Sequence, residues 1–257
     1  MHSAVVLLTY RNIVAVVDKL FLIWQILFPL VYIFVAGYAY SSLINEDEIV
    51  IGGKTIAYNV FLALGMIGFN VMNSSTVAGS IIWNDKRNGM LQQVLVMPFS
   101  KLQYIASTLL TIMIMGLASA AIIFLAGLPI IIAGNVTFDI TSILYLTFAL
   151  MMGSIFFGSI TIIISTRLKS NEGFTVIINT VFLFFAFASS TFYPPYGLPE
   201  PMQYAFYFNP LTYIADIIRE GLFSAVDTLT NIKVLILGAI SGTAFLLATF
   251  SMYKMRI

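Results

Sequence analysis

The sequence predicts an all-α membrane protein with six transmembrane helices, from its composition and from the spacing of its charges. The chain has 257 residues, of which 60% are hydrophobic and 9% are charged, and its mean hydropathy is +0.99. A soluble globular domain carries about 25% charged residues, so an ordinary water-soluble fold is excluded. The charges leave six long apolar runs between them, and a single transmembrane domain accounts for residues 1–257.

Each apolar run is long enough to cross a bilayer as a helix. About 20 apolar residues, at 1.5 Å each, span a hydrocarbon core of about 30 Å, and a helix satisfies its own backbone hydrogen bonds in lipid. The runs are too continuously apolar for barrel strands, whose side chains alternate in polarity. The predicted spans cover approximately residues 20–44, 56–84, 102–133, 140–166, 174–193 and 234–253.

The distribution of charges orients these helices. An even number of spans places both termini on one side, and the segments on that side carry nine basic residues against three on the other. Cytoplasmic loops of membrane proteins are enriched in lysine and arginine. The acidic residues have the opposite bias, with eight on the far side and three on the terminal side. We therefore expect both termini in the cytoplasm.

The segment before the first span, residues 2–19, is too short and too polar to cross the bilayer. Its polar residues recur at about helical spacing among valines and leucines. That pattern is typical of an interfacial helix lying on the inner leaflet. The alternative is a simple cytoplasmic extension of the first span.

The second predicted span is unusually polar for a membrane helix. Asn70, Asn73, Ser74 and Thr76 lie close together within it. In lipid, such side chains should face other helices or a polar path. They either form interhelical hydrogen bonds or line a substrate path, and both interpretations can hold together.

The loop of residues 85–101 contains a short amphipathic helix on the cytoplasmic side. Its apolar side chains recur at helical spacing against two glutamines: Leu91, Val94, Leu95 and Met97. Gly89 is expected to start this helix and Pro98 to end it. The helix could dock on a soluble partner or lie against lipid.

The outer segment of residues 194–233 begins with a proline-rich stretch that cannot continue a helix. The aromatic residues that follow are typical of a membrane–water interface. Asn209 is a good helix cap and Pro210 a favourable first-turn residue, so a helix should begin there. We expect one or two short re-entrant helices. Asp216 and Arg219 could pair at their three-residue spacing, and a solvated charged face is the alternative.

Gly238 and Gly242 form a GxxxG pair in the last predicted span. Small residues at this spacing let two membrane helices approach closely. The pattern is common in membrane helices, so it is weak support for a dimer face.

The composition argues against catalysis by side chains. The chain has no cysteine, and its only histidine is His2, which disfavours metal centres, cysteine nucleophiles and histidine-based triads. Gly53, Lys54 and Thr55 resemble the end of a phosphate-binding loop, but the position that needs another glycine is Glu48. We expect no enzyme activity, no cofactor and no metal in this chain. Its net charge of +1 gives no reason to expect nucleic acid.

Two segments together resemble the type-2 membrane subunit of ATP-binding-cassette transporters, the exporter permeases that include daunorubicin-resistance and nodulation-type proteins. After its second span, this family often carries a charged cluster, Gly-x-Leu, a short apolar helix and a proline, here Asp85, Arg87, Gly89, Leu91, Leu95 and Pro98. Before its last span it often carries Leu-Pro, then Asn-Pro-Leu-Thr-Tyr and an arginine, here Pro199, Asn209, Pro210, Tyr213 and Arg219. The resemblance covers nearly the whole chain. One acidic position of the charged cluster is lost, so any acidic contact depends on Asp85.

The resemblance implies a mechanism. Two such subunits, identical or related, would pair around a substrate path in a prokaryotic plasma (inner) membrane. Separate ATPase subunits, holding ATP and Mg²⁺, would bind beneath them, and residues 85–101 would transmit their closure. The alternatives are a stand-alone secondary carrier or channel, and an intramembrane enzyme. Ion-coupled carriers usually need ionisable groups inside the membrane, and none of the six apolar runs contains one.

Overall fold

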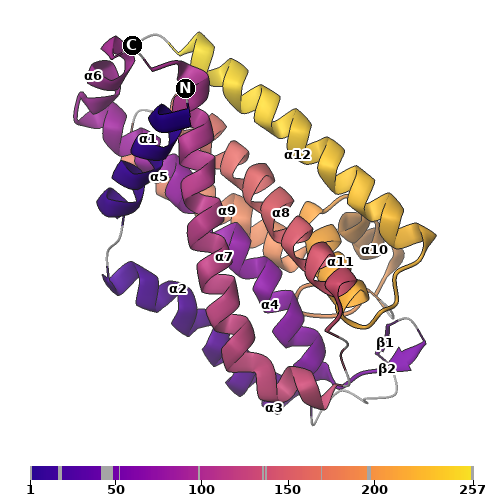
Figure 1. Cartoon of the computed structure of the whole chain (residues 1–257). Coiled ribbons are helices and arrows are strands. Elements are labelled where there is room, and N and C mark those ends of the chain that lie inside the picture. Colours follow the sequence, from indigo (N-terminus) through magenta and orange to yellow (C-terminus); the bar gives the residue numbers. More distant parts are fainter. Residues whose placement is uncertain are drawn as a thin grey trace.

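A computed structural model describes residues 2–16, 19–41, 49–51, 53–97, 99–134, 136, 138–168, 170–195 and 198–255. Long helices dominate it, which, together with their apolar composition, confirms the all-α membrane class. Both ends of the described chain lie at one end of the helical bundle, beside α6, and the short strands lie at the other end (Figure 1). The helices are α1 (His2–Val16), α2 (Lys19–Val31), the π-helical turn η1 (Tyr32–Ala36), α3 (Gly37–Ser41), α4 (Tyr58–Ser74), α5 (Thr76–Arg87), α6 (Met90–Val96), α7 (Lys101–Ala133), α8 (Ile140–Arg167), α9 (Asn171–Phe187), α10 (Glu200–Tyr207), α11 (Pro210–Leu222) and α12 (Thr228–Lys254).

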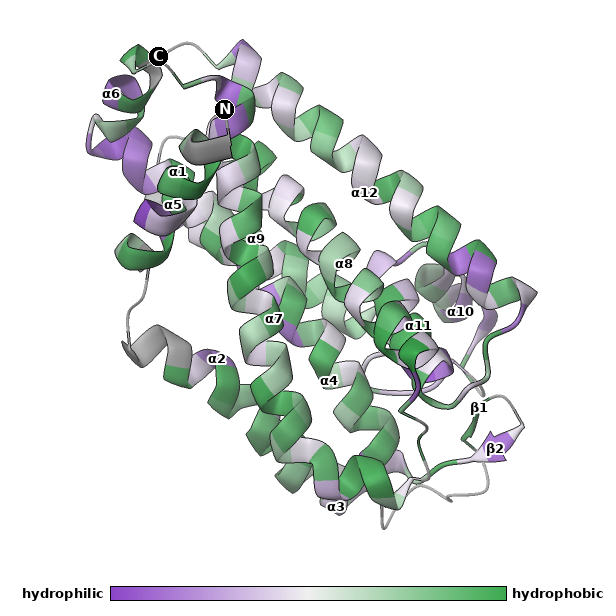
Figure 2. Cartoon of the chain, viewed as in Figure 1, coloured by the Kyte–Doolittle hydropathy of each residue, from purple (hydrophilic) through white to green (hydrophobic). Residues whose placement is uncertain are grey.

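Within the described residues, five helical stretches are long and apolar enough to cross a membrane: Ile23–Tyr40, Tyr58–Arg87, Lys101–Ala133, Ile140–Arg167 and Thr228–Lys254. Helix α9 has 17 residues, the lower end of the range for a span. It ends six residues before the predicted boundary, because the chain turns inward after Phe187. Hydrophilic residues gather at the two ends of the bundle, and apolar ones cover the middle (Figure 2).

The first span is one continuous helical path made of α2, η1 and α3. The π-helical turn from Tyr32 to Ala36 lies in its middle. The buried positions along this path are four residues apart: Gln25, Pro29, Ile33 and Gly37. The last residues of the predicted span, 42–44, lie outside the described residues.

The second predicted span is broken in two at Ser75, and this break was not predicted. Helix α4 ends at Ser74 and α5 begins at Thr76. The Ser75 hydroxyl donates to Val71 O at 2.8 Å, and the Ser75 carbonyl accepts from the Thr161 hydroxyl of α8 at 2.9 Å. The backbone carbonyls of Val71 and Ser75 thus have hydrogen-bond partners at the break. In lipid, every backbone polar group needs such a partner. Together α4 and α5 form the most buried of the five stretches.

A small antiparallel hairpin of β1 (Val50–Ile51) and β2 (Lys54–Thr55) follows the first span, and the sequence did not indicate it. Gly53 turns it with φ of +77°, a conformation that favours glycine. The Lys54 ammonium donates to Phe223 O at 3.2 Å and ties the hairpin to the end of α11.

An aspartate caps the last helix. The carboxylate of Asp227 accepts from the Thr230 N–H at 2.8 Å, and the Thr230 hydroxyl accepts from the Asp227 N–H at 3.2 Å, which forms a capping box. The hydrogen bonds from the backbone and side chain of Thr230 lower the pKa of Asp227 below its ordinary value. This cap starts α12 six residues before the predicted boundary of the last span.

Helix α1 packs against α7 rather than standing apart from the bundle. Its inward face carries Leu8, Thr9 and Asn12, all buried. Apolar side chains occupy the opposite, exposed face: Val6, Leu7, Tyr10 and Val14. The helix therefore keeps polar groups against protein and presents an apolar surface outward, which suits a helix lying against lipid.

Candidate functional site

The end of α5, which leads into the short helix α6, is anchored to the bundle through Asp85, the last buried residue of α5. Its carboxylate accepts a hydrogen bond from the Tyr104 hydroxyl of α7 at 2.7 Å and forms an ion pair with Arg11 of α1. Asp85 is 8% exposed. The single acidic group that the sequence singled out therefore joins three helices. Its partners were missed, because they lie 74 and 19 residues away in sequence.

Helix α6 has a buried face and an exposed tip. Gly89 precedes it with φ of +70°, which lets the chain reverse from α5 into α6. Leu91 and Val94 are 1% and 5% exposed, whereas Val96 and Met97 are 89% and 50% exposed. Met97 was expected to belong to this helix, and it follows the last helical residue, Val96, as the C-cap.

The remaining residues of this segment are placed as follows. Arg87 is exposed, with its guanidinium 5.3 Å from the centroid of the Trp83 ring. Lys86 donates to Leu168 O at 3.3 Å and ties α5 to the connection between α8 and α9. The side chain of Leu95, and Pro98 entirely, lie outside the described residues.

The outer segment places a cation deep inside the protein. Arg219 of α11 is 1% exposed, and its guanidinium lies 3.5 Å from the centroid of the Phe61 ring. It donates to Phe61 O at 3.2 and 3.0 Å and to Thr191 O at 3.2 Å. Asp216 lies 3.6 Å away on the same helix. The expected pairing is present, and the alternative of a solvated charged face is wrong for Arg219, because α4 covers it.

Asn209 fixes the start of α11. Its side-chain oxygen accepts from the Leu211 N–H at 2.9 Å, and its amide donates to Phe185 O and Ala188 O, both at 2.7 Å. The cap therefore also holds the end of α9. Pro210 is buried as the first residue of α11, as the sequence indicates. The other residues singled out here are Pro199, which precedes α10, and Tyr213, whose hydroxyl donates to Tyr207 O.

The polar residues of the second span divide between two faces. Asn70 and Ser74 are 0% and 1% exposed. Asn70 donates to the Ser119 hydroxyl of α7 at 2.7 Å, and Ser74 accepts a hydrogen bond from Gln25 of α2. These residues form interhelical hydrogen bonds inside the subunit.

The other face carries what we call the polar stripe, Asn73, Thr76 and Ser80. Between residues 60 and 83 these three are the only residues that are not buried. Their spacing of three and four places them on one helical face. The Thr76 and Ser80 hydroxyls donate back to Asn73 O at 2.8 Å and Thr76 O at 3.2 Å. Among the described residues, the Asn73 carboxamide has no hydrogen-bond partner, so it is free to bind another group.

Residues 85–101, most of the outer segment and the helices between them match one protein family. The family model described as ABC-2 type transporter matches residues 3–223. The chain belongs to the ABC-2 type transporter family. It is accordingly a multi-pass membrane permease of an ABC transporter. No curated protein matches the chain significantly.

In this permease, an aromatic cluster lies one helical turn beyond the polar stripe. Phe69 precedes Asn73 by four residues, and its ring centroid lies 5.8 Å from that of Phe28 and 5.6 Å from that of Phe192. Phe28 and Tyr32 come from the first span, and Phe192 from the turn after α9. The cluster therefore closes the space between the first span and the end of α9 at this level.

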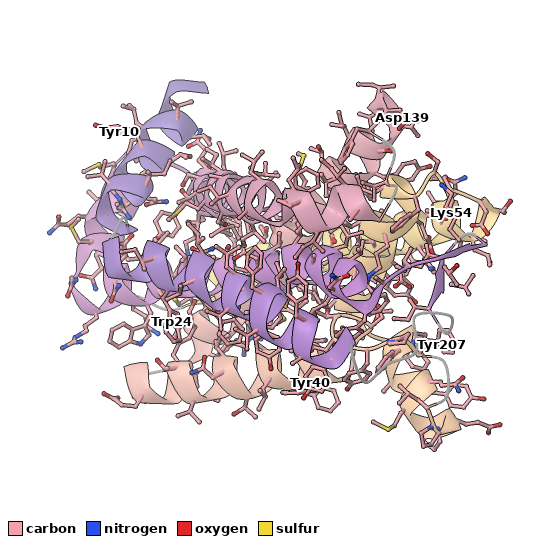
Figure 3. The ribbon with its side chains drawn as sticks, turned by 90° about the horizontal axis from the view of Figure 1, so that it is seen from below. Tyr10, Trp24, Tyr40, Lys54, Asp139 and Tyr207 are labelled. Atoms are coloured by element: carbon pink, nitrogen blue, oxygen red, sulfur yellow. The ribbon has the colours of Figure 1, made fainter. Side chains whose placement is uncertain are left out.

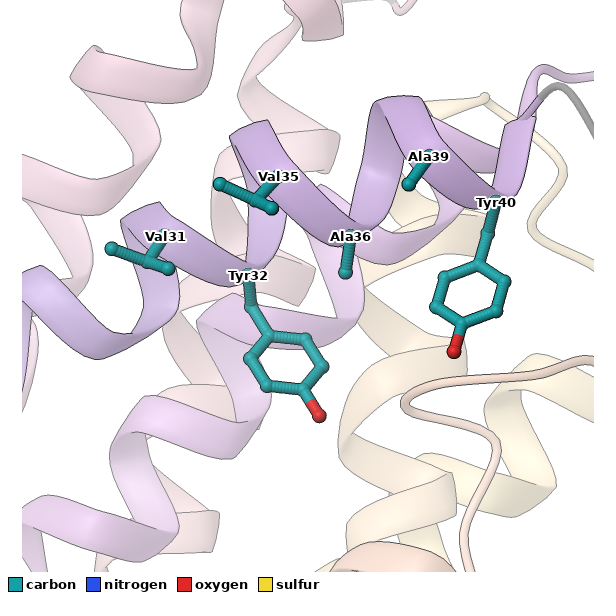
Figure 4. Close-up of a pocket in the computed structure, with 6 residues that line it drawn as sticks. All are labelled: Val31, Tyr32, Val35, Ala36, Ala39 and Tyr40. Atoms are coloured by element: carbon teal, nitrogen blue, oxygen red, sulfur yellow. The ribbon is translucent and has the colours of Figure 1, made fainter.

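An apolar pocket of about 480 Å³ adjoins this cluster at Tyr32 and extends along the first span toward the end of the bundle that carries the hairpin (Figure 1). It is lined by Val31, Tyr32, Val35, Ala36, Ala39 and Tyr40 (Figure 4). The side chains of Tyr32 and Tyr40 project from the same side of the helix in this view. Trp24 and Tyr40 lie toward opposite ends of the first span when the molecule is seen from below (Figure 3).

Metal binding finds no support in the described part of the permease, where no group of three acidic or histidine side chains could hold an ion. The expectation that the chain uses no cofactor stays a prediction.

Proposed function

We propose that this permease is the membrane subunit of an ATP-driven exporter. It would pair with a second subunit, identical or related, and be driven by separate ATPase subunits that hold ATP and Mg²⁺. The observation that carries the proposal is the form of α6, a helix with a buried base and an exposed apolar tip at the end of the bundle where both termini lie. An 89% exposed valine on such a tip is suited to a partner protein.

The contacts of Asp85 support a role in transmitting motion. Its carboxylate links α1, α5 and α7. Removing one member of such a buried network is costly, so the three helices should move together. A force applied at the α6 tip would then displace the base of the substrate path rather than bend a loose loop.

The path itself would run along the polar stripe. The stripe is uncharged and half-buried, and it ends at the aromatic cluster of Phe28, Tyr32, Phe69 and Phe192. We propose that the cluster closes the path in one nucleotide state and separates in the other. Such a change needs two packings with different affinity for the nucleotide-bound ATPase.

The docking proposal is tested by introducing a negative charge at the tip. Val96→Glu should lower copurification of the ATPase subunit and the ATPase rate of the complex by about tenfold, because it buries a carboxylate in an apolar contact. Met202→Glu is the matched control, since Met202 is similarly apolar and 45% exposed on α10, outside the tip. Normal complex formation by Val96→Glu would contradict the proposed docking surface.

The path proposal is tested by thiol accessibility, and the chain contains no native cysteine. Cysteines at Asn73 and Thr76 should react with a small water-soluble methanethiosulfonate, at a rate that changes when ATP is trapped on the partner. A cysteine at Thr243, exposed on the outside of α12, should stay unreactive in lipid. If neither stripe cysteine reacts in any nucleotide state, the stripe is no path.

A stand-alone carrier or channel is the second candidate. The polar stripe contains no ionisable group, which favours coupling to a partner over coupling to an ion gradient. Reconstitution of the purified chain alone decides between the two. Transport without any ATPase would overturn the exporter proposal.

A further inference from the structure

A second apolar groove, of about 510 Å³, lies away from the polar stripe, between α7, α8 and α12. Among the residues that line it are Ala106 and Met113 of α7, Met152 of α8, and Gly238 and Gly242 of α12. This groove is where the GxxxG pair of the last span lies.

The two glycines are not needed for packing within the chain. A Cβ added at Gly242 would meet nothing within 4 Å, and one at Gly238 would come no closer than 3.8 Å to Phe148. At Gly158, by contrast, an added Cβ would lie 2.3 Å from Ile112. The GxxxG pair therefore leaves an opening on the outer surface of the subunit.

The groove lies at the depth of the acyl chains of one leaflet. At 1.5 Å per residue, Ala106 and Met113 lie about 8 and 18 Å from the start of α7, and Phe245 and Gly238 about 14 and 24 Å from the end of α12. The chains of one leaflet occupy about 15 Å beneath a headgroup layer of about 5–8 Å.

Three cations stand where these helices end. Lys101 begins α7 and donates to Met252 O at 3.3 Å. Arg167, in the last turn of α8, has its Nε 3.5 Å from the Ser251 hydroxyl, and Lys254 ends α12. None of the four ion pairs found among the described residues involves these three cations.

The cations and the groove lie along one line of α12. Gly238, Gly242, Phe245 and Met252 are separated by four, three and seven residues, which keeps them on one helical face. Lys101 donates to the carbonyl of Met252, about two turns beyond Phe245, so its charge lies near the end of α12 toward which this face runs.

We propose that this groove binds an anionic phospholipid. One acyl chain would lie over Gly242, and the phosphate would contact Lys101, Arg167 and Lys254. Clusters of lysine and arginine at a membrane surface attract anionic lipids by about 1 kcal/mol each. A second copy of the chain is the less favourable occupant, because symmetric pairing around an axis along the membrane normal would bring two identical clusters of unpaired cations together.

Native mass spectrometry of the purified full-length chain tests the proposal, with dioleoylphosphatidylglycerol as the anionic probe and dioleoylphosphatidylcholine as the zwitterionic one. The wild-type chain should retain the anionic lipid at least about tenfold better. The triple variant Lys101→Gln, Arg167→Gln, Lys254→Gln should lose this preference. Lys86→Gln with Arg87→Gln, exposed cations at the same end of the bundle, should keep it.

A second variant separates the groove from the charges. A Cβ at Gly242 meets nothing within 4 Å, so Gly242→Leu should fold, and its side chain should occupy the groove so that neither lipid is retained at the wild-type level. Ala239→Leu, on the exposed side of the same helix, should retain both.

Wild-type lipid retention by Gly242→Leu, or by the triple variant, would overturn the proposal. Disulfide-linked dimers formed by Gly242→Cys in membranes would also overturn it, in favour of a second copy in the groove.

Discussion

Replacing Arg219 by methionine tests whether the buried guanidinium holds the outer segment against α4. Methionine keeps an unbranched side chain but removes every donor. Phe61 O and Thr191 O then lose hydrogen bonds of 3.0–3.2 Å in a site that is 1% exposed. Asp216 keeps one cation, since Lys233 lies 3.1 Å from it.

The expected loss can be estimated from these contacts. An unsatisfied buried acceptor costs about 1–3 kcal/mol, and removing one member of a buried ionic network costs about 3–5 kcal/mol. We expect Arg219→Met to lower the free energy of unfolding by about 3–5 kcal/mol, measured by titration with sodium dodecyl sulfate in mixed micelles. Arg87→Met is the control. Its cation lies over Trp83 at an exposed site and should contribute about 0.5–1 kcal/mol.

Gly65→Ala probes the same site from the other side. An added Cβ would lie 2.4 Å from Thr191 O and 2.5 Å from an Arg219 nitrogen. The two substitutions affect the same contacts. The double variant should therefore lose less unfolding free energy than the sum of the losses in the two single variants. A folded Arg219→Met protein within about 1 kcal/mol of wild type, or strict additivity with Gly65→Ala, would refute the reasoning.

Three further predictions concern topology, acid stability and packing. A cysteine at Thr55 should react with a membrane-impermeant thiol reagent added outside intact cells, and a cysteine at Asn88 should not. The opposite labelling would contradict the placement of both termini in the cytoplasm. The stability from the Asp227 cap is present above the ordinary aspartate pKa of 3.8 and is lost as the pH falls through its lowered value, because protonation weakens the acceptor. The melting temperature of Asp227→Asn should therefore fall less steeply than that of the wild type as the pH is lowered. An unchanged dependence on pH would show that the cap does not cause the fall. Gly79→Ala places a Cβ 2.5 Å from an aromatic ring of α9 and 2.9 Å from a backbone oxygen of α8, and should destabilise the fold by about 1–3 kcal/mol in the same detergent titration. An effect below that range would show that α9 moves aside.

Local signals were enough to predict several elements. Gly89 before α6, and Asn209 and Pro210 at the start of α11, lie where the capping pattern placed them. Caps depend on a few neighbouring residues, so a single sequence reveals them. The long apolar runs likewise indicated the main helices, with boundaries shifted where a cap or a turn intervened.

Features that depend on distant partners could not be predicted. The polar residues of the second span were recognised, but nothing in the sequence separates Asn70, which meets Ser119 of α7, from Asn73, which faces outward. At the break, the Ser75 carbonyl accepts a hydrogen bond from Thr161 of α8, 86 residues away in sequence. The burial of Arg219 depends on the packing of α11 against α4, and no local pattern distinguishes that from a solvated face.

The π-helical turn of the first span has a consequence for its register. Buried positions that recur every four residues drift by about 40° per turn in a regular α-helix, which repeats every 3.6 residues. Over the three steps from Gln25 to Gly37 the drift would reach about 120°, enough to rotate Gly37 off the packed face. The wider turn at Tyr32–Ala36 absorbs part of this rotation within one span. Deleting one residue there would leave the helix intact but swing everything after it around the axis, including the Tyr40 wall of the outer pocket.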